Sequence, residues 1–189
     1  MSEADPLYWF EMHGSDLSFS NAAVLRLAGP RLSAATLQNW ANRGFVSPKI
    51  ETKNVKGRRR YSAGQLLHVV LGHKLVDNFK IPPAAAIAAI SMAKLDFNRQ
   101  LFDAGIFNES AKTVSIDFSG VKNMWAVVEA TPTELRGVKV VAIRRITDAL
   151  QGSSPYAFVF PFGAEYLDLA ARAMRVHQEM SKADDEDGD

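Results

Sequence analysis

The sequence contains no cysteine among its 189 residues. This absence excludes disulfide bonds, thiolate zinc sites, thiol nucleophiles and redox sensing by cysteine. Histidine is also sparse, and the four histidines are scattered along the chain. His68 and His73 lie five residues apart in one predicted helix, so their side chains diverge and make poor joint metal ligands. We therefore expect no metal site.

Long apolar runs are absent as well. No segment approaches the roughly 18 uninterrupted apolar residues that a membrane helix needs. The first residues, MSEADPLYWFEMHGSD, begin with acids and lack the basic segment and apolar core of a signal peptide. The sequence therefore predicts a soluble, cytoplasmic protein without a membrane partner.

Motifs of common enzyme classes are missing too. The chain has no GxxxxGK[ST] phosphate loop, no GxSxG nucleophile elbow and no HExxH metalloprotease helix. Its densest carboxylates form the solvated run ADDEDGD at the end of the chain, not a buried acid and base pair. We therefore expect no enzyme, no catalytic residue and no cofactor.

What the sequence does have is an uneven distribution of charge. The net charge is +1, but residues 21–80 hold eleven basic and two acidic residues, a net charge of +9. The remaining eleven basic and nineteen acidic residues give −8. A concentrated positive field suits a polyanion, because each neutralised phosphate releases condensed counterions. The segment is therefore a candidate nucleic-acid-binding module.

The first half of this module has the pattern of two short helices joined by a turn. The stretch NAAVLRLAG repeats apolar residues at helical spacing and ends at Gly29-Pro30. Ser33 is placed to cap a second helix, SAATLQNWANRG, which Gly44 closes in the left-handed conformation. The pattern predicts a helix-turn-helix.

The two faces of the second helix differ in chemistry. Leu37, Trp40 and Ala41 are predicted to face the core. Thr36, Asn39 and Arg43 share another face, which has no acid to repel DNA. Hydroxyl, amide and guanidinium groups are the types that hydrogen-bond to base edges and phosphates.

A basic hairpin is predicted next, over SPKIETKNVKGRRR from residue 47 to residue 60, with turn-forming residues in its middle. Ser62 is then placed to cap a leucine-rich helix. A fourth, alanine-rich helix begins after Ile81-Pro82-Pro83, because proline suits a first turn.

The order of these elements resembles the winged helix-turn-helix domain of the MerR family. The motifs that carry the resemblance are Arg43-Gly44-Phe45-Val46 at the end of the second helix and Gly-x-Arg-x-Tyr-Ser from Gly57 to Ser62. The resemblance covers about residues 18–92 and stops there. It implies that Thr36, Gln38, Asn39 and Trp40 meet the major groove, and that Arg59 and Tyr61 hold the DNA backbone.

The complete set of candidate DNA-binding residues joins the helix face, the turn before it and the hairpin: Arg31, Ser33, Thr36, Gln38, Asn39, Trp40, Arg43, Lys53, Lys56, Arg58, Arg59, Arg60 and Tyr61.

Strands are predicted in the second half of the chain. Val114, Ile116 and Phe118 alternate, WAVVEA and VKVVAI are apolar and β-branched, and YAFVFPF places aromatic residues at alternate positions. Three or four strands and a final amphipathic helix are therefore expected. The acidic tail, residues 181–189, is predicted to be disordered.

The predicted class is α+β, with an N-terminal winged helix-turn-helix and a smaller α+β domain. The predicted ranges are 1–17 for an N-terminal extension, 18–100 for the DNA-binding domain and 101–180 for a domain that dimerises or binds a partner. The function that follows is a sequence-specific regulator of transcription, of bacterial or phage type, which binds double-stranded DNA in the nucleoid as a homodimer on paired half-sites. Two alternatives stay open: an architectural or excisionase-like DNA-binding protein, and an adaptor whose C-terminal domain binds another protein.

Overall fold

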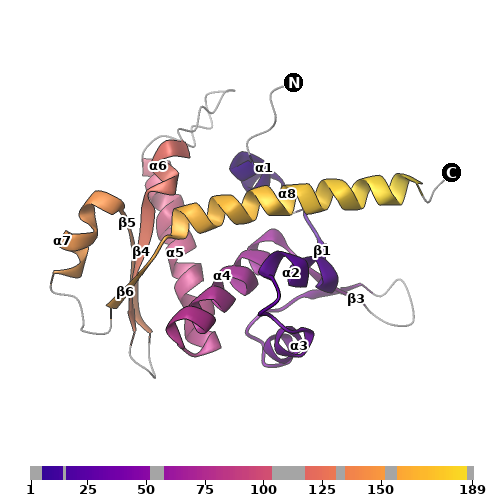
Figure 1. The fold of residues 1–189 in the computed structure, drawn as a ribbon, viewed down its shortest axis with the longest axis horizontal. Helices are drawn as coiled ribbons and strands as arrows, with labels where there is room; N and C mark the ends of the chain where they lie inside the picture. Colours follow the sequence, from indigo (N-terminus) through magenta and orange to yellow (C-terminus); the bar gives the residue numbers. More distant parts are fainter. Residues whose placement is uncertain are drawn as a thin grey trace.

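The computed structural model describes residues 6–14, 16–51, 58–103, 118–130, 135–151 and 157–186. These residues form an α+β fold with two three-stranded sheets and helices around them (Figure 1). The predicted α+β class is confirmed. The elements are, in chain order, α1 (Pro6–His13), β1 (Phe19–Ser20), α2 (Asn21–Ala28), α3 (Ala34–Asn42), β2 (Lys49–Glu51), β3 (Arg58–Tyr61), α4 (Ala63–Phe79), α5 (Pro83–Asp103), α6 (Phe118–Lys122), β4 (Met124–Ala130), β5 (Leu135–Ala142), η1 (Ile143–Arg145), α7 (Ile146–Leu150), β6 (Ala157–Phe160) and α8 (Phe162–Glu186).

Serine caps start α2, α3 and α4. The side-chain oxygens of Ser20, Ser33 and Ser62 each accept a hydrogen bond from the backbone amide three residues later. At α4 the side chain of Gln65 accepts a hydrogen bond from the Ser62 amide in return, which completes a capping box. A cap of this kind stabilises a helix by about 1 kcal/mol. The helix starts predicted at Ser33 and Ser62 are therefore confirmed.

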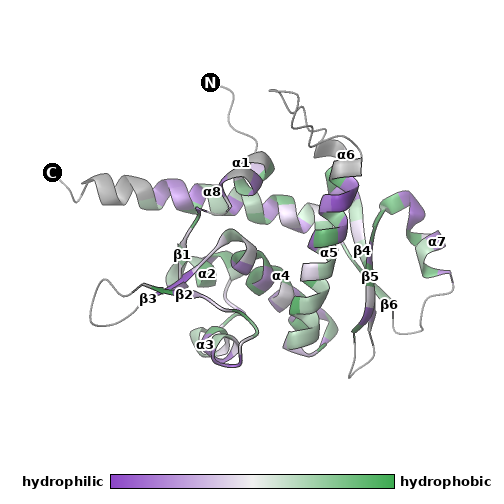
Figure 2. Ribbon diagram, turned by 180° about the vertical axis from the view of Figure 1, so that it is seen from behind, coloured by the Kyte–Doolittle hydropathy of each residue, from purple (hydrophilic) through white to green (hydrophobic). Residues whose placement is uncertain are grey.

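Glycine and proline set two further boundaries as predicted. Gly44, just after α3, has a φ of 72°, in the left-handed region that glycine adopts without steric cost. Pro83 is the first residue of α5, where its missing N–H leaves no hydrogen bond unmade. In Figure 2, α5 is coloured mostly hydrophobic, in keeping with its packing against α4 on one side and β5 on the other.

The first sheet has the strand order β1-β3-β2, and both pairings are antiparallel. Phe19 of β1 lies opposite Tyr61 of β3, and Lys49 of β2 lies opposite Arg60. Strand β2 falls within the predicted basic hairpin, and β3 extends one residue beyond it, to Tyr61; the middle of the hairpin, residues 52–57, lies outside the described residues. Because β1 pairs with β3, the start of α2 comes next to the arginines of β3.

The second sheet has the order β5-β4-β6, again antiparallel, and these are the three strands predicted from WAVVEA, VKVVAI and YAFVFPF. Side chains of α5 hydrogen-bond to the backbone of one residue, Val140, on the outer edge of β5. The Val140 amide donates to Asp96 Oδ2 at 2.8 Å, and Gln100 Nε2 donates to the Val140 carbonyl at 2.6 Å. These bonds satisfy backbone groups that an edge strand would otherwise expose.

Two predictions for the second half of the chain differ from the structure. Phe118, predicted to be in a strand, is the first residue of α6, which packs against α8; the alternating residues before it lie outside the described residues. Helix α8 continues to Glu186, into the segment 181–189 for which disorder is predicted. No glycine or proline interrupts the chain between residues 164 and 186, so nothing local ends the helix earlier. Residues 187–189 lie outside the described residues.

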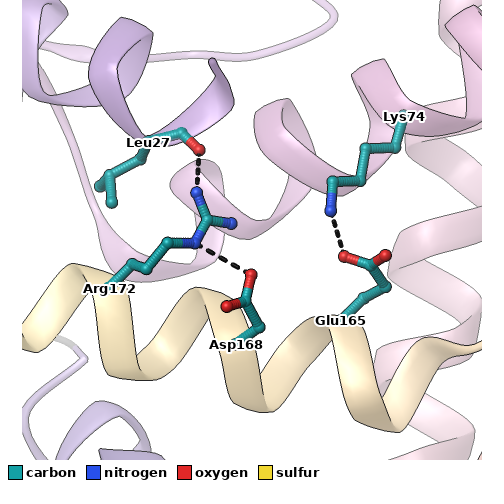
Figure 3. A network of polar contacts seen from close by, with 5 residues as sticks. All are labelled: Leu27, Lys74, Glu165, Asp168 and Arg172. Carbon is teal, nitrogen blue, oxygen red and sulfur yellow. Dashed lines mark hydrogen bonds and ion pairs between the residues drawn. The ribbon is translucent and has the colours of Figure 1, made fainter.

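Helix α8 connects the two halves of the molecule (Figures 1 and 3). Arg172 donates to the Leu27 carbonyl at the end of α2 and to Asp168 Oδ2 at 2.9 Å. Lys74 of α4 forms an ion pair with Glu165 of α8. The buried side chains form one cluster that includes residues of α2, α4, α5 and α8. The predicted boundary between residues 100 and 101 therefore falls inside a continuous core.

A partly buried polar cluster joins α1, α5 and α8. The Glu11 carboxylate accepts hydrogen bonds from the Lys94 ammonium and the Tyr166 hydroxyl. Lys94 Nζ also donates to Asn98 Oδ1 at 2.7 Å and lies 4.6 Å from the centre of the Tyr166 ring. The Lys94 and Glu11 side chains are only 19% and 18% exposed. Burial lowers the pKa of Lys94, against the opposing effect of Glu11, and raises the pKa of Tyr166 well above its usual value.

The helices in the described ranges include none with the length and apolar content to cross a membrane.

Candidate nucleic-acid interface

One face of α3 is exposed and carries amide side chains. Gln38 and Asn39 are exposed on one turn and Asn42 on the next, and Arg43, at the C-terminal cap of the helix, is exposed beside them. Amide and guanidinium groups can form paired hydrogen bonds with the edges of adenine and guanine. The face therefore has the chemistry to read bases.

The start of α3 is organised by two of the predicted contacts. Ser33 Oγ accepts a hydrogen bond from the Thr36 amide at 3.0 Å, and the two hydroxyl oxygens lie 2.9 Å apart. Thr36 is half-buried. Both hydroxyls are thus hydrogen-bonded within the protein, where they fix the first turn of α3.

A side-chain hydrogen bond joins the β3 strand to the end of α3. Arg59 Nη2 donates to Asn42 Oδ1 at 2.9 Å, and the bond is exposed to solvent. Helix and strand therefore present their polar groups on one surface.

A groove of about 630 Å³ lies beside this bond, where α2, α3 and β3 meet. It is lined by Ser20, Asn21, Ala22, Gln38, Arg58, Arg59 and Arg60. The three guanidinium groups are positive, and so is the N-terminal end of α2, where backbone amides carry the positive pole of the helix dipole. The described lining residues include no acid. The groove is therefore suited to an anion such as a backbone phosphate.

Two residues of the predicted set are buried and are withdrawn from it. Trp40 is 2% exposed and packs edge-on against the His73 ring, with ring centroids 6.1 Å apart. Tyr61 is 0% exposed, and its hydroxyl is buried. Burial raises the pKa of Tyr61, and the nearby Arg59 charge opposes that rise. Neither ring can reach DNA from this position, because both side chains are enclosed in the buried cluster.

Replacing Tyr61 with phenylalanine is expected to leave DNA affinity unchanged. Within the described residues, the Tyr61 hydroxyl has no hydrogen-bond partner, so its removal abolishes a desolvation cost of about 1–3 kcal/mol. The variant should therefore unfold at the same urea concentration as the parent protein or a higher one. Urea denaturation measures the stability, and DNA titration measures the affinity. A clear loss of DNA affinity with the fold intact would mean that the Tyr61 hydroxyl contributes to DNA binding.

Arg31, a further predicted contact, does not line the groove. Arg31 lies in the turn between α2 and α3, where its guanidinium donates to Asp77 Oδ2 of α4 at 2.6 Å. This bond raises the pKa of Arg31 and lowers the pKa of Asp77. Lys53 and Lys56 lie outside the described residues.

The sequence analysis missed the contribution of α2. Ser20, Asn21 and Ala22 line the groove because β1 pairs with β3, about forty residues later in the chain. The serine cap at Ser20 was a visible signal of a helix N-terminus. No local pattern, however, indicated which arginines that N-terminus would face.

In the described ranges, no three histidine, aspartate or glutamate side chains come together in a way that could hold a metal ion. No known protein-family model matches the chain, and no curated protein matches it at a significant level.

Proposed function

We propose that this protein is a sequence-specific regulator that binds double-stranded DNA through α3 and the sheet beside it. In this proposal the exposed face of α3 enters the major groove. The arginines of β3 and the N-terminus of α2 hold the DNA backbone, as in a winged helix-turn-helix. The protein acts as a dimer on paired half-sites.

The observation that carries the proposal is the cationic groove beside α3. Three arginines and a helix N-terminus line it, and Gln38 of α3 lies at its border. Contacts to phosphates supply affinity and register, whereas contacts to base edges supply specificity. The groove offers the first kind directly beside a helix that offers the second.

Selection of bound fragments from a random duplex library, followed by titration at two salt concentrations, tests the proposal. An inverted repeat with steep salt dependence is the expected result. Failure to bind any duplex would contradict the proposal. The positively charged segment, residues 21–80, would then bind an anionic partner other than duplex DNA.

Replacing Asn39 with alanine is expected to reduce the preference for the selected sequence and to leave binding to unrelated duplexes unchanged. An asparagine that forms paired hydrogen bonds with adenine contributes about 1–3 kcal/mol of discrimination. The ratio of the two affinities should therefore fall by about 5-fold to 150-fold. Arg58→Ala is the matched control, because loss of a phosphate contact weakens binding to both duplexes alike. A uniform loss in Asn39→Ala would contradict a role in base reading.

A second candidate function is architectural, and Ile50 favours it. This β2 residue is 65% exposed and lies opposite Arg59 in the sheet. Architectural proteins insert such apolar side chains between base steps and bend the duplex. Binding without a selected motif, together with a bend that is lost in Ile50→Ala, would favour this function over sequence-specific regulation.

A further inference from the structure

The second sheet has two faces that are covered by different elements. Helices α5 and α8 pack on one face and share with it the continuous buried cluster, which includes Val128 and Val140. Val127 and Val141 are also buried, at 3% and 6% exposed, but they lie outside that cluster. Because successive residues of a strand point to opposite faces, these two lie on the face toward α7 (Figures 1 and 2). The outer face of the sheet is therefore apolar and separate from the main core.

A groove of about 720 Å³ lies where β5, η1 and α7 meet. Val141 and Ala142 of β5 and Ala149 of α7 contribute apolar surface to it. Sites for small molecules commonly measure roughly 300–1,000 Å³ and combine apolar walls with a few polar groups. The groove therefore has the size of a small-molecule site.

The described lining of this groove carries a net charge of +2. Its charged residues are three cations and one acid, and all four are exposed: Lys139, Arg144, Arg145 and Asp148. Among the described residues, none of the four takes part in an ion pair. The positive charge is a local excess, because residues 135–151 hold four basic residues and one acid, whereas the chain outside residues 21–80 carries −8. Cations gathered in a groove without a partner favour the binding of an anion.

We propose that this groove binds a phosphate monoester carried on a small organic body. A phosphate monoester has a charge of about −1.5 to −2 at pH 7, which complements the positive lining. Arg144 and Arg145 suit this group, because a planar guanidinium donates two parallel hydrogen bonds to phosphate oxygens. The apolar wall that includes Val141 and Ala149 is then left for the organic part of the ligand.

This site is separate from the candidate DNA interface. In Figure 1, α7 lies at the opposite end of the molecule from β3, whose arginines line the groove beside α3. The proposal therefore does not rest on the proposed DNA binding.

Isothermal titration calorimetry of the full-length protein with phenyl phosphate tests the proposal. Phenyl sulfate has the same shape but one negative charge, and inorganic phosphate has the charge but no organic body. Phenyl phosphate is expected to bind more tightly than either. Equal affinity for phenyl sulfate would contradict the charge match, and equal affinity for inorganic phosphate would contradict the assignment of an ester. Absence of phenyl phosphate binding would overturn the proposal.

Replacing Arg144 and Arg145 with glutamine is expected to weaken phenyl phosphate binding by roughly 10-fold to 150-fold for each arginine, the range for hydrogen bonds to charged groups. Arg136→Gln with Arg175→Gln is the charge-matched control, since both arginines are exposed and neither lines the groove. The control should bind as the parent protein does, and circular dichroism checks the fold of both variants. Equal losses in the two double variants would mean that net charge, and not the groove, holds the anion.

Asp148→Asn gives a readout in the opposite direction. It removes the acid from the described lining, so the affinity for phenyl phosphate should rise by about 2-fold to 5-fold, the usual effect of one exposed charge. An unchanged or lower affinity in this folded variant would count against the groove as the binding site. None of these measurements uses DNA, so failure of this site is distinguishable from failure of the proposed DNA binding.

Discussion

Replacing both Arg58 and Arg59 with alanine is expected to weaken binding to every duplex and to flatten its salt dependence. Both arginines line the groove beside α3, and Arg59 also donates a hydrogen bond to Asn42 Oδ1. Each lost phosphate contact reduces the slope of log K against log salt by about 0.9, so the slope should change by about 1.8. The same relation predicts an affinity loss of roughly 60-fold at about 0.1 M salt. Fluorescence anisotropy titrations across a salt series measure both quantities.

Arg144→Ala with Arg145→Ala is the charge-matched control. These two exposed arginines lie in η1, in the second half of the chain, and their removal changes the net charge by the same amount. If DNA lies in the groove beside α3, this control keeps the parent slope. Equal losses in the two double variants would mean that net charge, and not the groove, determines binding.

Replacing Glu11 with methionine is expected to destabilise the folded protein by up to about 3–5 kcal/mol, the cost of leaving one partner of a fully buried ion pair alone, because this pair is only partly buried. Glu11 is the carboxylate that both Lys94 and Tyr166 contact. Burial already lowers the pKa of Lys94, which means that its charged form is poorly solvated in the folded state. Without Glu11 that charge keeps only the Asn98 amide oxygen among the acceptors described for it. Urea denaturation measures the loss of unfolding free energy.

A second substitution separates loss of charge pairing from loss of packing. Adding Lys94→Met to Glu11→Met removes the unpaired charge and should recover most of the stability, because apolar residues of similar size replace buried ion pairs well. Glu179→Met is the exposed control: Glu179 pairs with Arg26 between α8 and α2, and both side chains are more than half exposed. Its loss should cost less than about 1 kcal/mol. No recovery in the double variant would show that the cost comes from packing of α1.

The sequence by itself determined the local elements of the first half. Caps at Ser33 and Ser62, the left-handed Gly44 and the start at Pro83 are each governed by a few neighbouring residues, and the structure confirms all of them. The exposed amides of α3 and the arginines of β3 were predicted for the same reason. A helix period and a run of like charges are visible without any knowledge of the fold.

Only the tertiary structure decided which of these groups come together and which are buried. Trp40 and Tyr61 carry the chemistry of DNA contacts, but α4 and the sheet enclose them. Arg31 belongs to the same basic segment and is instead paired with Asp77. The N-terminus of α2 faces the arginines of β3 because β1 pairs with a strand far along the chain. Side-chain chemistry and spacing fix what a residue can bind, whereas long-range packing fixes which residues remain exposed to bind it.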